Sequence, residues 1–250
     1  MNALSLDGVS KRFGGLEAVR DVHMDVPHGE RRALIGPNGA GKTTLFNVIA
    51  GDLPVTEGII TVFDQDVTGM PPHRRVKLGL TRTYQTSALF DSLTVIQNMY
   101  LGVIGPAGSR HFDLLRLADK DTVHQERALE VIEAVGLEDR VKTPTGDLSH
   151  GERRQLEVGL AIAYKPRLVM LDEPAAGLSP EERYVLMDLL NGLEQDITLL
   201  LIEHDMDVAF NVSERVTVLN DGSIIEEGTP EEISANDMVQ KVYLGERLDD

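Results

Sequence analysis

The sequence predicts an α/β fold: a core with a mostly parallel sheet, an N-terminal antiparallel β subdomain and an inserted α-helical subdomain. Two short, largely apolar runs, Leu168–Leu171 and Thr198–Ile202, are typical of parallel strands covered on both faces. Near the N-terminus apolar and polar residues alternate, which indicates antiparallel strands. In a long middle block the apolar residues recur at helical spacing instead. We expect a single domain, 1–250, with a core of 1–85 and 166–250 and a helical subdomain of 86–165.

The composition fits a self-contained acidic domain. A chain of 250 residues can bury roughly 70–75% of its unfolded surface. With 24 Lys and Arg against 41 Asp and Glu, the formal net charge is −17, so we expect no nucleic-acid partner. The chain has no cysteine, which excludes a disulfide framework and thiolate chemistry.

No segment is predicted to enter or cross a membrane. The N-terminus lacks the long apolar stretch of a signal peptide. No run approaches the roughly 18 apolar residues that a membrane span needs. If the protein works at a membrane, another chain must supply the spanning part.

The first expected elements are antiparallel strands. Leu4 and Leu6 alternate with polar residues, as do Val22, Met24 and Val26 before the turn at 27–30.

Phe13 lies between these strands in the sequence KRFGG. Its flanking charges and glycines argue against a core position. It is either an aromatic residue of a surface loop or a ring that stacks on a purine.

The segment GPNGAGKTT fits the phosphate-loop (P-loop) pattern, with an apolar strand before it and a helical run after it. Glycines let successive backbone N–H groups point inward around phosphate oxygens, and the dipole of the following helix adds positive potential. Lys42 would reach the β- and γ-phosphates of a nucleotide, and the Thr43 hydroxyl would bind Mg²⁺. The nucleotide-binding residues predicted here are Gly36, Pro37, Asn38, Gly39, Ala40, Gly41, Lys42, Thr43 and Thr44.

After the loop we expect a helix ending near Gly51, a strand at Gly58–Val62 and another at Leu80–Tyr84. Gln85 follows the last of these strands, where open α/β sheets place groups that contact ligands. On this evidence alone it is equally well explained as a loop residue.

The middle block begins with a capping box at Thr94 and Gln97, and a later helix stops at Gly136. Its last helix begins at Ser149, with Glu152 closing a second capping box. The capping box is a complete explanation of these residues. The same exposed N–H groups, with Gly151 beside them, also suit an anion, and the pattern does not decide between the two.

The run ending in Asp172 and Glu173 is the most informative of the second half. Two carboxylates at the end of a buried strand are costly unless they are solvated, paired or bound to a cation. Solvated loop acids are the simpler interpretation. With a P-loop in the same chain, we expect Asp172 to orient Mg²⁺ and Glu173 to polarise the attacking water.

The remaining elements follow in order. Ser179 and Glu182 cap a helix that begins with Pro180. His204 follows the strand 198–202; a lone histidine there is usually structural, but its sheet edge also suits a γ-phosphate contact. A hairpin is expected around 220–223, and Thr229 is expected to cap a last helix.

Taken together, these motifs resemble the ATP-binding subunit of an ABC transporter over essentially the whole chain. GPNGAGKTT resembles Walker A, LVMLDE Walker B, LSHGE at 148–152 the signature, and 176–180 the D-loop. The resemblance implies a RecA-like P-loop core, with Gln85 as the Q-loop residue and a ligand of Mg²⁺, His204 as the switch histidine and Phe13 stacking on adenine. The signature departs from its commonest form, LSGGQ, at His150 and Glu152.

Further strings narrow the resemblance. GERRQLEVG, LDEPAAGLSP, LIEHDM and a terminal YLGE look like the ATPase subunits of branched-chain amino acid importers. That resemblance implies transmembrane permease subunits, a solute-binding protein acting indirectly, and a place on the cytoplasmic face of the membrane. The permease is expected to dock on the surface near Thr86–Tyr100. The ATPase chain does not touch the solute, so the sequence leaves the solute open.

The family mechanism implied is a head-to-tail dimer, with this chain or a paralogue as the second ATPase subunit. Each ATP lies between the P-loop of one subunit and the signature of the other, so that Ser149, Gly151 and Glu152 act in trans. The catalytic residues implied are Glu173, His204 and Gln85. Two other functions stay open: the ATPase of a lipid or lipopolysaccharide exporter, which shares the SxGE signature, and, less expected, a soluble ABC ATPase acting on ribosomes or DNA.

Overall fold

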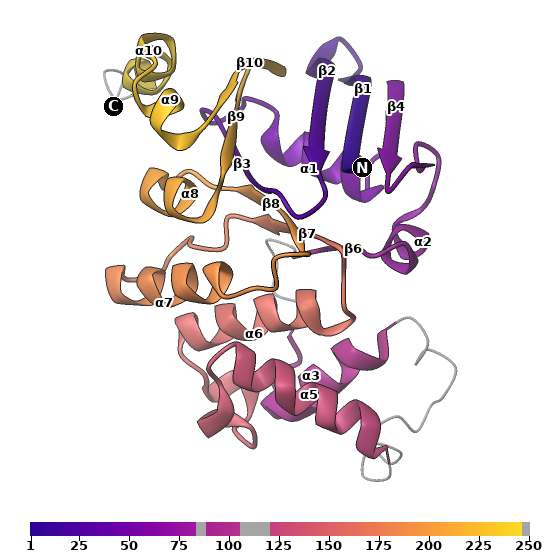
Figure 1. Cartoon of the computed structure of the whole chain (residues 1–250), viewed down its shortest axis with the longest axis vertical. Coiled ribbons are helices and arrows are strands. Elements are labelled where there is room, and N and C mark those ends of the chain that lie inside the picture. Colours follow the sequence, from indigo (N-terminus) through magenta and orange to yellow (C-terminus); the bar gives the residue numbers. More distant parts are fainter. Residues whose placement is uncertain (84–88, 106–120, 247–250) are drawn as a thin grey trace.

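A computed structural model describes residues 1–83, 89–105 and 121–246, with side chains described as far as 242. Tyr84, Gln85 and most of the loop expected at 105–109 lie outside these residues. The described elements form two sheets and two groups of helices. Figure 1 shows them with the long axis of the molecule vertical.

The N-terminal sheet is antiparallel, with the order β2-β1-β4-β5. Leu6 pairs with Met24 and Leu4 with Val26, so the alternating apolar residues share one buried face. The predicted antiparallel strands are therefore confirmed. The strands are β1 (Asn2–Phe13), β2 (Leu16–Pro27), β4 (Glu57–Val62) and β5 (Gln65–Asp66).

The second sheet has the order β10-β9-β3-β8-β7-β6. All neighbouring strands in it are parallel except the hairpin of β9 and β10. It is the mostly parallel sheet that the sequence predicts. Its strands are β3 (Arg31–Ile35), β6 (Leu80–Arg82), β7 (Leu168–Asp172), β8 (Thr198–Ile202), β9 (Arg215–Asn220) and β10 (Ser223–Gly228).

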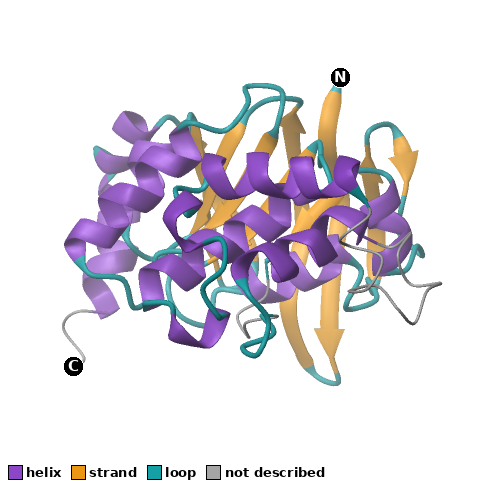
Figure 2. Cartoon of the chain, turned by 90° about the horizontal axis from the view of Figure 1, so that it is seen from below, coloured by secondary structure: helices purple, strands orange, loops and turns teal. Residues whose placement is uncertain are grey.

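The inserted helices within the described residues are α3 (Val95–Ile104), α5 (Thr122–Ala134) and α6 (His150–Ala163), with short 3₁₀ turns η2 (Glu138–Arg140) and η3 (Thr145–Asp147). They pack on one another at the end of the molecule away from the antiparallel sheet (Figure 1). Seen from that end, helices lie in front of the strands (Figure 2). Each predicted capping box is present: Thr94 with Gln97, and Ser149 with Glu152.

The remaining helices belong to the core: α1 (Lys42–Ala50), α2 (Pro72–Lys77), α7 (Pro180–Asn191), α8 (Met206–Val212), α9 (Pro230–Ser234) and α10 (Asp237–Glu246). Ser179 and Glu182 cap α7, and Thr229 caps α9, as expected. The sequence predicted that the helix after Thr229 is the last; this is wrong, because α9 stops at Ser234 and α10 follows. Among the described residues, no helix is long and apolar enough to cross a membrane.

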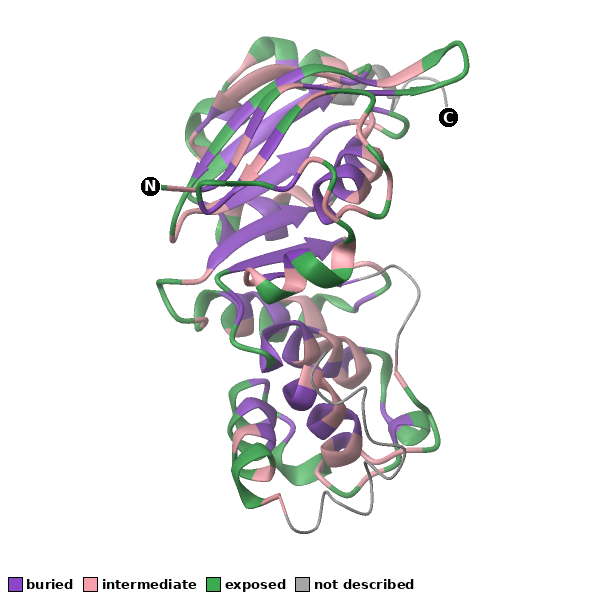
Figure 3. Ribbon diagram, turned by 90° about the vertical axis from the view of Figure 1, so that its right-hand side faces the viewer, coloured by how far each residue is buried: buried purple, intermediate pink, exposed green. Residues whose placement is uncertain are grey.

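The parallel sheet separates two hydrophobic cores. Leu168, Met170 and Leu200 face α1 and the antiparallel sheet, whereas Val169 and Leu201 face α6 and α7. Figure 3 shows the buried strands and, below them, a second buried region inside the helical group. Because alternate residues of β7 and β8 serve the two cores, α1 and α6 lie on opposite faces of one sheet.

Candidate active site

The P-loop connects β3 to α1, and its backbone requires glycine. Gly36 has φ 152° and Gly41 has φ 101°. A Cβ atom would lie 2.1 Å from the carbonyl oxygen of Leu219 at Gly36 and 2.3 Å from that of Ala18 at Gly41. Since both obstacles are backbone atoms, only glycine fits at these positions.

Lys42 begins α1 and is folded back onto the loop. Its Nζ donates to the carbonyl oxygens of Gly36 at 2.5 Å and Pro37 at 2.9 Å, and the residue is 7% exposed. Among the described residues, no side chain caps α1 and no acid occupies its first turn. The loop therefore presents a buried cation and an uncapped helix start, which favours an anion. The other predicted loop residues range from buried Ala40, through partly buried Pro37, Thr43 and Thr44, to exposed Asn38 and Gly39.

Phe13 ends β1 at the hairpin that leads into β2. Its ring is 46% exposed, and Lys11 Nζ lies 5.0 Å from the ring centroid. Phe13 pairs with Leu16 across the hairpin, and Ala18 a little further along β2 touches Gly41. The P-loop therefore lies against β2 two residues beyond the strand partner of Phe13.

Four strand ends meet at one edge of the parallel sheet. β3, β8, β7 and β6 are neighbours in that order and run parallel. Their carboxyl ends lead into the P-loop, Glu203–His204, Asp172–Glu173 and Thr83, respectively. This is the edge at which open α/β sheets bind ligands.

Asp172 is completely buried at this edge. Its Oδ2 accepts a 3.4 Å hydrogen bond from Arg82 Nη2, while its buried Oδ1 has no partner among the described residues. Burial raises the pKa of Asp172, and Arg82 offsets part of that effect. A buried carboxylate oxygen without a donor suits a cation. Within the described ranges, however, no three His, Cys, Asp or Glu side chains gather as a metal site, so Asp172 would need ligands of other kinds.

Glu173 and His204 face each other across the end of the sheet. His204 Nδ1 lies 3.9 Å from Glu173 Oε2, and both side chains reach solvent. Glu173 has φ 48°, a left-handed conformation that is rare for a residue with a side chain. Its N–H donates to Ile202 O at 2.9 Å, which fixes the turn against β8.

Glu203 belongs to the same edge, although the sequence reasoning passed over it. It is fully buried, and Oε1 accepts from Ala175 N–H at 2.8 Å while Oε2 accepts from His204 N–H at 3.2 Å. Burial raises the pKa of Glu203, and these N–H donors offset part of that effect. An acid at the end of an apolar strand, the same signal that singled out Asp172, was present in the sequence. Glu203 ties the turn after Glu173 to His204.

The start of α6 is satisfied within the chain. Ser149 Oγ accepts from Glu152 N–H at 3.1 Å, and Glu152 Oε1 accepts from Arg140 Nε at 2.6 Å. Gly151 N–H donates to Glu182 Oε1 on α7 at 3.1 Å. The two residues that depart from LSGGQ thus have partners: Glu152 caps the helix and pairs with Arg140, and His150 Nε2 lies 3.2 Å from Ala176 O.

The fold brings only part of the predicted site together. The P-loop, Asp172, Glu173 and His204 share one sheet edge. Ser149, Gly151 and Glu152 lie at the start of α6, which packs on the face of the sheet opposite α1, and a separate cavity of about 280 Å³ opens there between α6 and α7. Gln85 lies outside the described residues, and its role stays a prediction.

Comparison with known proteins identifies the family. The sequence profile of the ABC transporter family matches residues 19–176. The chain belongs to the ABC transporter family. A second profile, "Branched-chain amino acid ATP-binding cassette transporter", matches residues 223–249.

Relatives of this ABC ATPase match over nearly their whole length. It is 38% identical to the high-affinity branched-chain amino acid transport ATP-binding proteins BraF of Pseudomonas aeruginosa and LivG of Escherichia coli K12, over 97% of this chain and 98% of each relative. A crystal structure of the ADP conformation of an ATP-binding cassette of an ABC transporter superposes with a TM-score of 0.84 at 30% identity, covering 98% of this chain and 99% of that one. The chain is thus an ATP-hydrolysing member of the family, and its α/β fold is confirmed.

Proposed function

We propose that the chain is the ATPase subunit of an importer for branched-chain amino acids or closely related small solutes. The C-terminal profile match and the relatives named for this transport support the proposal and favour it over a lipid exporter. The protein would lie on the cytoplasmic face of the membrane, bound to transmembrane permease subunits. A solute-binding protein would deliver the solute to those subunits.

One observation carries the mechanism: α1, which the P-loop begins, packs on one face of the parallel sheet, whereas α6 packs on the other. A nucleotide held at the start of α1 would therefore lie on the other side of the sheet from the helix that begins with Ser149 and Gly151 of its own chain. Two chains arranged head to tail would let the α6 start of one complete the P-loop edge of the other. The second chain is this one or a paralogue.

The residues present fit ATP and Mg²⁺. The P-loop leads into an α1 start with no side-chain cap and no acid in its first turn, and the unpartnered Oδ1 of Asp172 lies at the same edge. Lys42 Nζ would exchange its carbonyl partners for phosphate oxygens, and Phe13 would stack on adenine. Mg²⁺ would be held by Thr43 and Asp172, with Gln85, and would neutralise phosphate charge. Glu173 would accept the proton of the attacking water, with His204 beside it.

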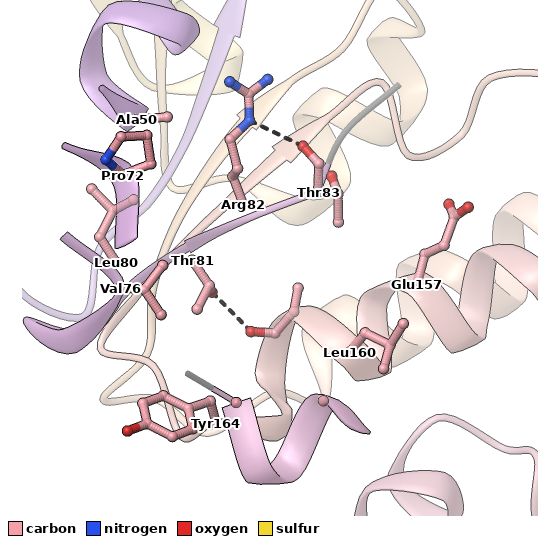
Figure 4. A pocket seen from close by; sticks show the side chains of 13 residues that line it. Ala50, Pro72, Val76, Leu80, Thr81, Arg82, Thr83, Glu157, Leu160 and Tyr164 are labelled. Carbon is pink, nitrogen blue, oxygen red and sulfur yellow. Dashed lines mark hydrogen bonds between the residues drawn. The ribbon is translucent and has the colours of Figure 1, made fainter. Parts of the chain in front are cut away.

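The permease would dock where the helical subdomain meets the core. An apolar cavity of about 260 Å³ lies between α2 and β6 on one side and α3 and α6 on the other. Figure 4 shows Leu80 and Val76 on the core side, and Leu160 and Tyr164 at α6. The strand β6, which ends in Arg82 and Thr83 at the ATP edge, forms one wall. A permease segment seated here would contact both the helical subdomain and the strand leading to Gln85.

The proposal is tested in cells that lack the native gene and carry a tagged copy. Pulldown from solubilised membranes should recover a permease pair, and uptake of labelled leucine, isoleucine or valine should depend on the chain. Glu173→Gln should bind ATP, form a stable dimer and stop turnover and uptake. A complex that moves lipid instead of amino acids overturns the solute class, and wild-type hydrolysis by Glu173→Gln overturns the role of Glu173.

A further inference from the structure

Arg154, on the second turn of α6, hydrogen-bonds to the backbone of the turn that carries Glu173. Its Nη2 donates to Glu173 O and its Nε to Pro174 O, each at 2.7 Å. Its Nη1 donates to Glu157 at 2.6 Å, and the arginine side chain is only 12% exposed. The planar guanidinium thus donates hydrogen bonds to two successive carbonyl oxygens, a bidentate arrangement that a lysine cannot reproduce.

The gripped turn is conformationally demanding. Glu173 holds φ 48°, and such a conformation persists only where the surroundings impose it. Glu173 O also accepts from Ala176 N–H at 3.1 Å, and Glu203 holds Ala175 N–H from the other side. Arg154 supplies the cationic part of this frame. It is also close enough to Asp172 to lower the pKa of that residue, against the larger effect of burial.

We propose that Arg154 is a positioning residue for ATP hydrolysis: it fixes the peptide of Glu173 so that the carboxylate points at the nucleotide edge. This inference rests on the proposed role of Glu173 as the base. Arg154 touches no expected ATP atom of its own site and acts through the turn alone.

The position of Arg154 adds a consequence. The same helix begins at the residues expected to meet the partner's ATP, and His150 reaches Ala176 O of the same turn at 3.2 Å. Movement of the α6 start would therefore be transmitted to Glu173 of the same chain. Arg154 is thus a direct link between the helix that begins at Ser149 and the turn that carries Glu173.

The competing explanation is charge balance, in which Arg154 only neutralises Glu157 and Asp172. A lysine would serve that purpose, whereas the fork to two carbonyls needs arginine. The experiment therefore compares Arg154→Lys, Arg154→Gln and Arg154→Ala in the full-length chain. Arg153→Ala is the matched control, because Arg153 is adjacent on α6 but bonds Asp91 and Thr145 instead.

We expect kcat to fall about tenfold or more in all three Arg154 variants, including lysine, a loss of about 1.4 kcal/mol in transition-state stabilisation. Equilibrium affinity for ATP should stay within about twofold, since the P-loop is untouched. The control should keep its wild-type rate. Wild-type kcat in Arg154→Lys, or parallel losses of kcat and ATP affinity, overturns the inference. If the alanine variant does not fold, the lysine and glutamine variants carry the same comparison.

A double-mutant cycle separates this inference from the proposed function. If Arg154 acts only through Glu173, Arg154→Ala should lower the residual rate of Glu173→Gln by less than about twofold. An undiminished effect in that background shows that Arg154 acts elsewhere and overturns the inference. Wild-type hydrolysis by Glu173→Gln instead overturns the role of Glu173 on which the inference rests.

Discussion

The starts of α1 and α6 are both helix N-termini with glycine beside them, yet they are built in opposite ways. In the described part of the chain, α1 has no side-chain cap and no acid in its first turn, and it carries Lys42. The α6 start has a complete capping box, and Gly151 N–H already donates to Glu182. One start presents positive potential, whereas the other has its donors satisfied by the Ser149 hydroxyl and by the carboxylates of Glu152 and Glu182.

The difference indicates how each start would meet phosphate. An uncapped helix start with a buried lysine favours an anion at all times. A helix start whose N–H donors are already hydrogen-bonded within the chain binds an anion weakly unless the carboxylate that accepts from those donors, here that of Glu182, moves aside. We therefore expect the α1 start to determine nucleotide affinity and the α6 start to determine dimer closure.

Removing the lysine of the α1 start is expected to have the largest effect. Lys42→Ala should weaken ATP binding about 100-fold or more, which corresponds to about 2.7 kcal/mol, because charge-assisted hydrogen bonds to phosphate are lost. Equilibrium titration with a fluorescent ATP analogue measures this. Lys77→Ala, an exposed lysine on α2, is the control and should bind normally. Normal affinity in Lys42→Ala contradicts the P-loop assignment.

Local patterns in the sequence predicted both starts. The capping boxes at Thr94–Gln97, Ser149–Glu152 and Ser179–Glu182 depend on residues three apart, so each is readable without the fold. The P-loop is recognisable because a strand and a helix flank it in the sequence.

The contacts that hold Asp172, Glu173 and the turn after them were not predictable from local patterns. Arg82 meets Asp172, Glu203 meets Ala175 and Arg154 meets Glu173 only because β6, β7 and β8 are neighbours and α6 packs beneath them. These pairs are far apart in the sequence, and nothing local specifies strand order. The hydrogen bond from Gly151 N–H to Glu182 was not predicted for the same reason, since it joins two helices.

Adding a methyl group at each glycine tests how rigid the two starts are. Gly41→Ala should lower the free energy of unfolding by about 3 kcal/mol, because a left-handed alanine costs about 1–2 kcal/mol and the neighbouring obstacle is backbone. At Gly151 the obstacle is the Glu182 side chain, with Oε1 2.5 Å and Cγ 2.9 Å from a Cβ, and its displacement disturbs the α7 capping box, in which Oε2 accepts from Ser179 N–H. Higher helix propensity offsets part of that loss, so Gly151→Ala should lower stability by about 1 kcal/mol, less than Gly41→Ala. Urea denaturation compares them, and equal losses would contradict the contrast.

Neutralising Glu182 tests whether its carboxylate competes with phosphate at the α6 start. In the Glu173→Gln background, Glu182→Gln should tighten the ATP-dependent dimer about two- to fivefold, since one negative charge at a helix N-terminus has an effect of that order. Analytical ultracentrifugation at several ATP concentrations measures the dimer constant. Glu181→Gln, the exposed neighbour on α7, should leave it unchanged. A weaker dimer in Glu182→Gln would mean that the carboxylate supports closure.

The smallest expected effect is on the pH dependence of stability. The N–H of Ser179, and with a smaller effect that of Gly151, lowers the pKa of Glu182, and His150 acts in the same direction. A lowered pKa in the folded state means that the carboxylate stabilises the protein above the ordinary glutamate pKa of about 4.3. That contribution is lost as the pH falls through the lowered pKa of the folded state.

Urea denaturation of wild type and Glu182→Gln between pH 3 and pH 7 tests this sign. The difference between their free energies of unfolding should be constant above about pH 5 and shrink below it, because protonation removes the charge that glutamine lacks throughout. Glu181→Gln should follow wild type at every pH. A difference that grows on acidification would mean that the N–H groups of Ser179 and Gly151 do not stabilise the Glu182 carboxylate. It would contradict the conclusion that the α6 start, unlike the α1 start, is satisfied by a carboxylate of its own chain.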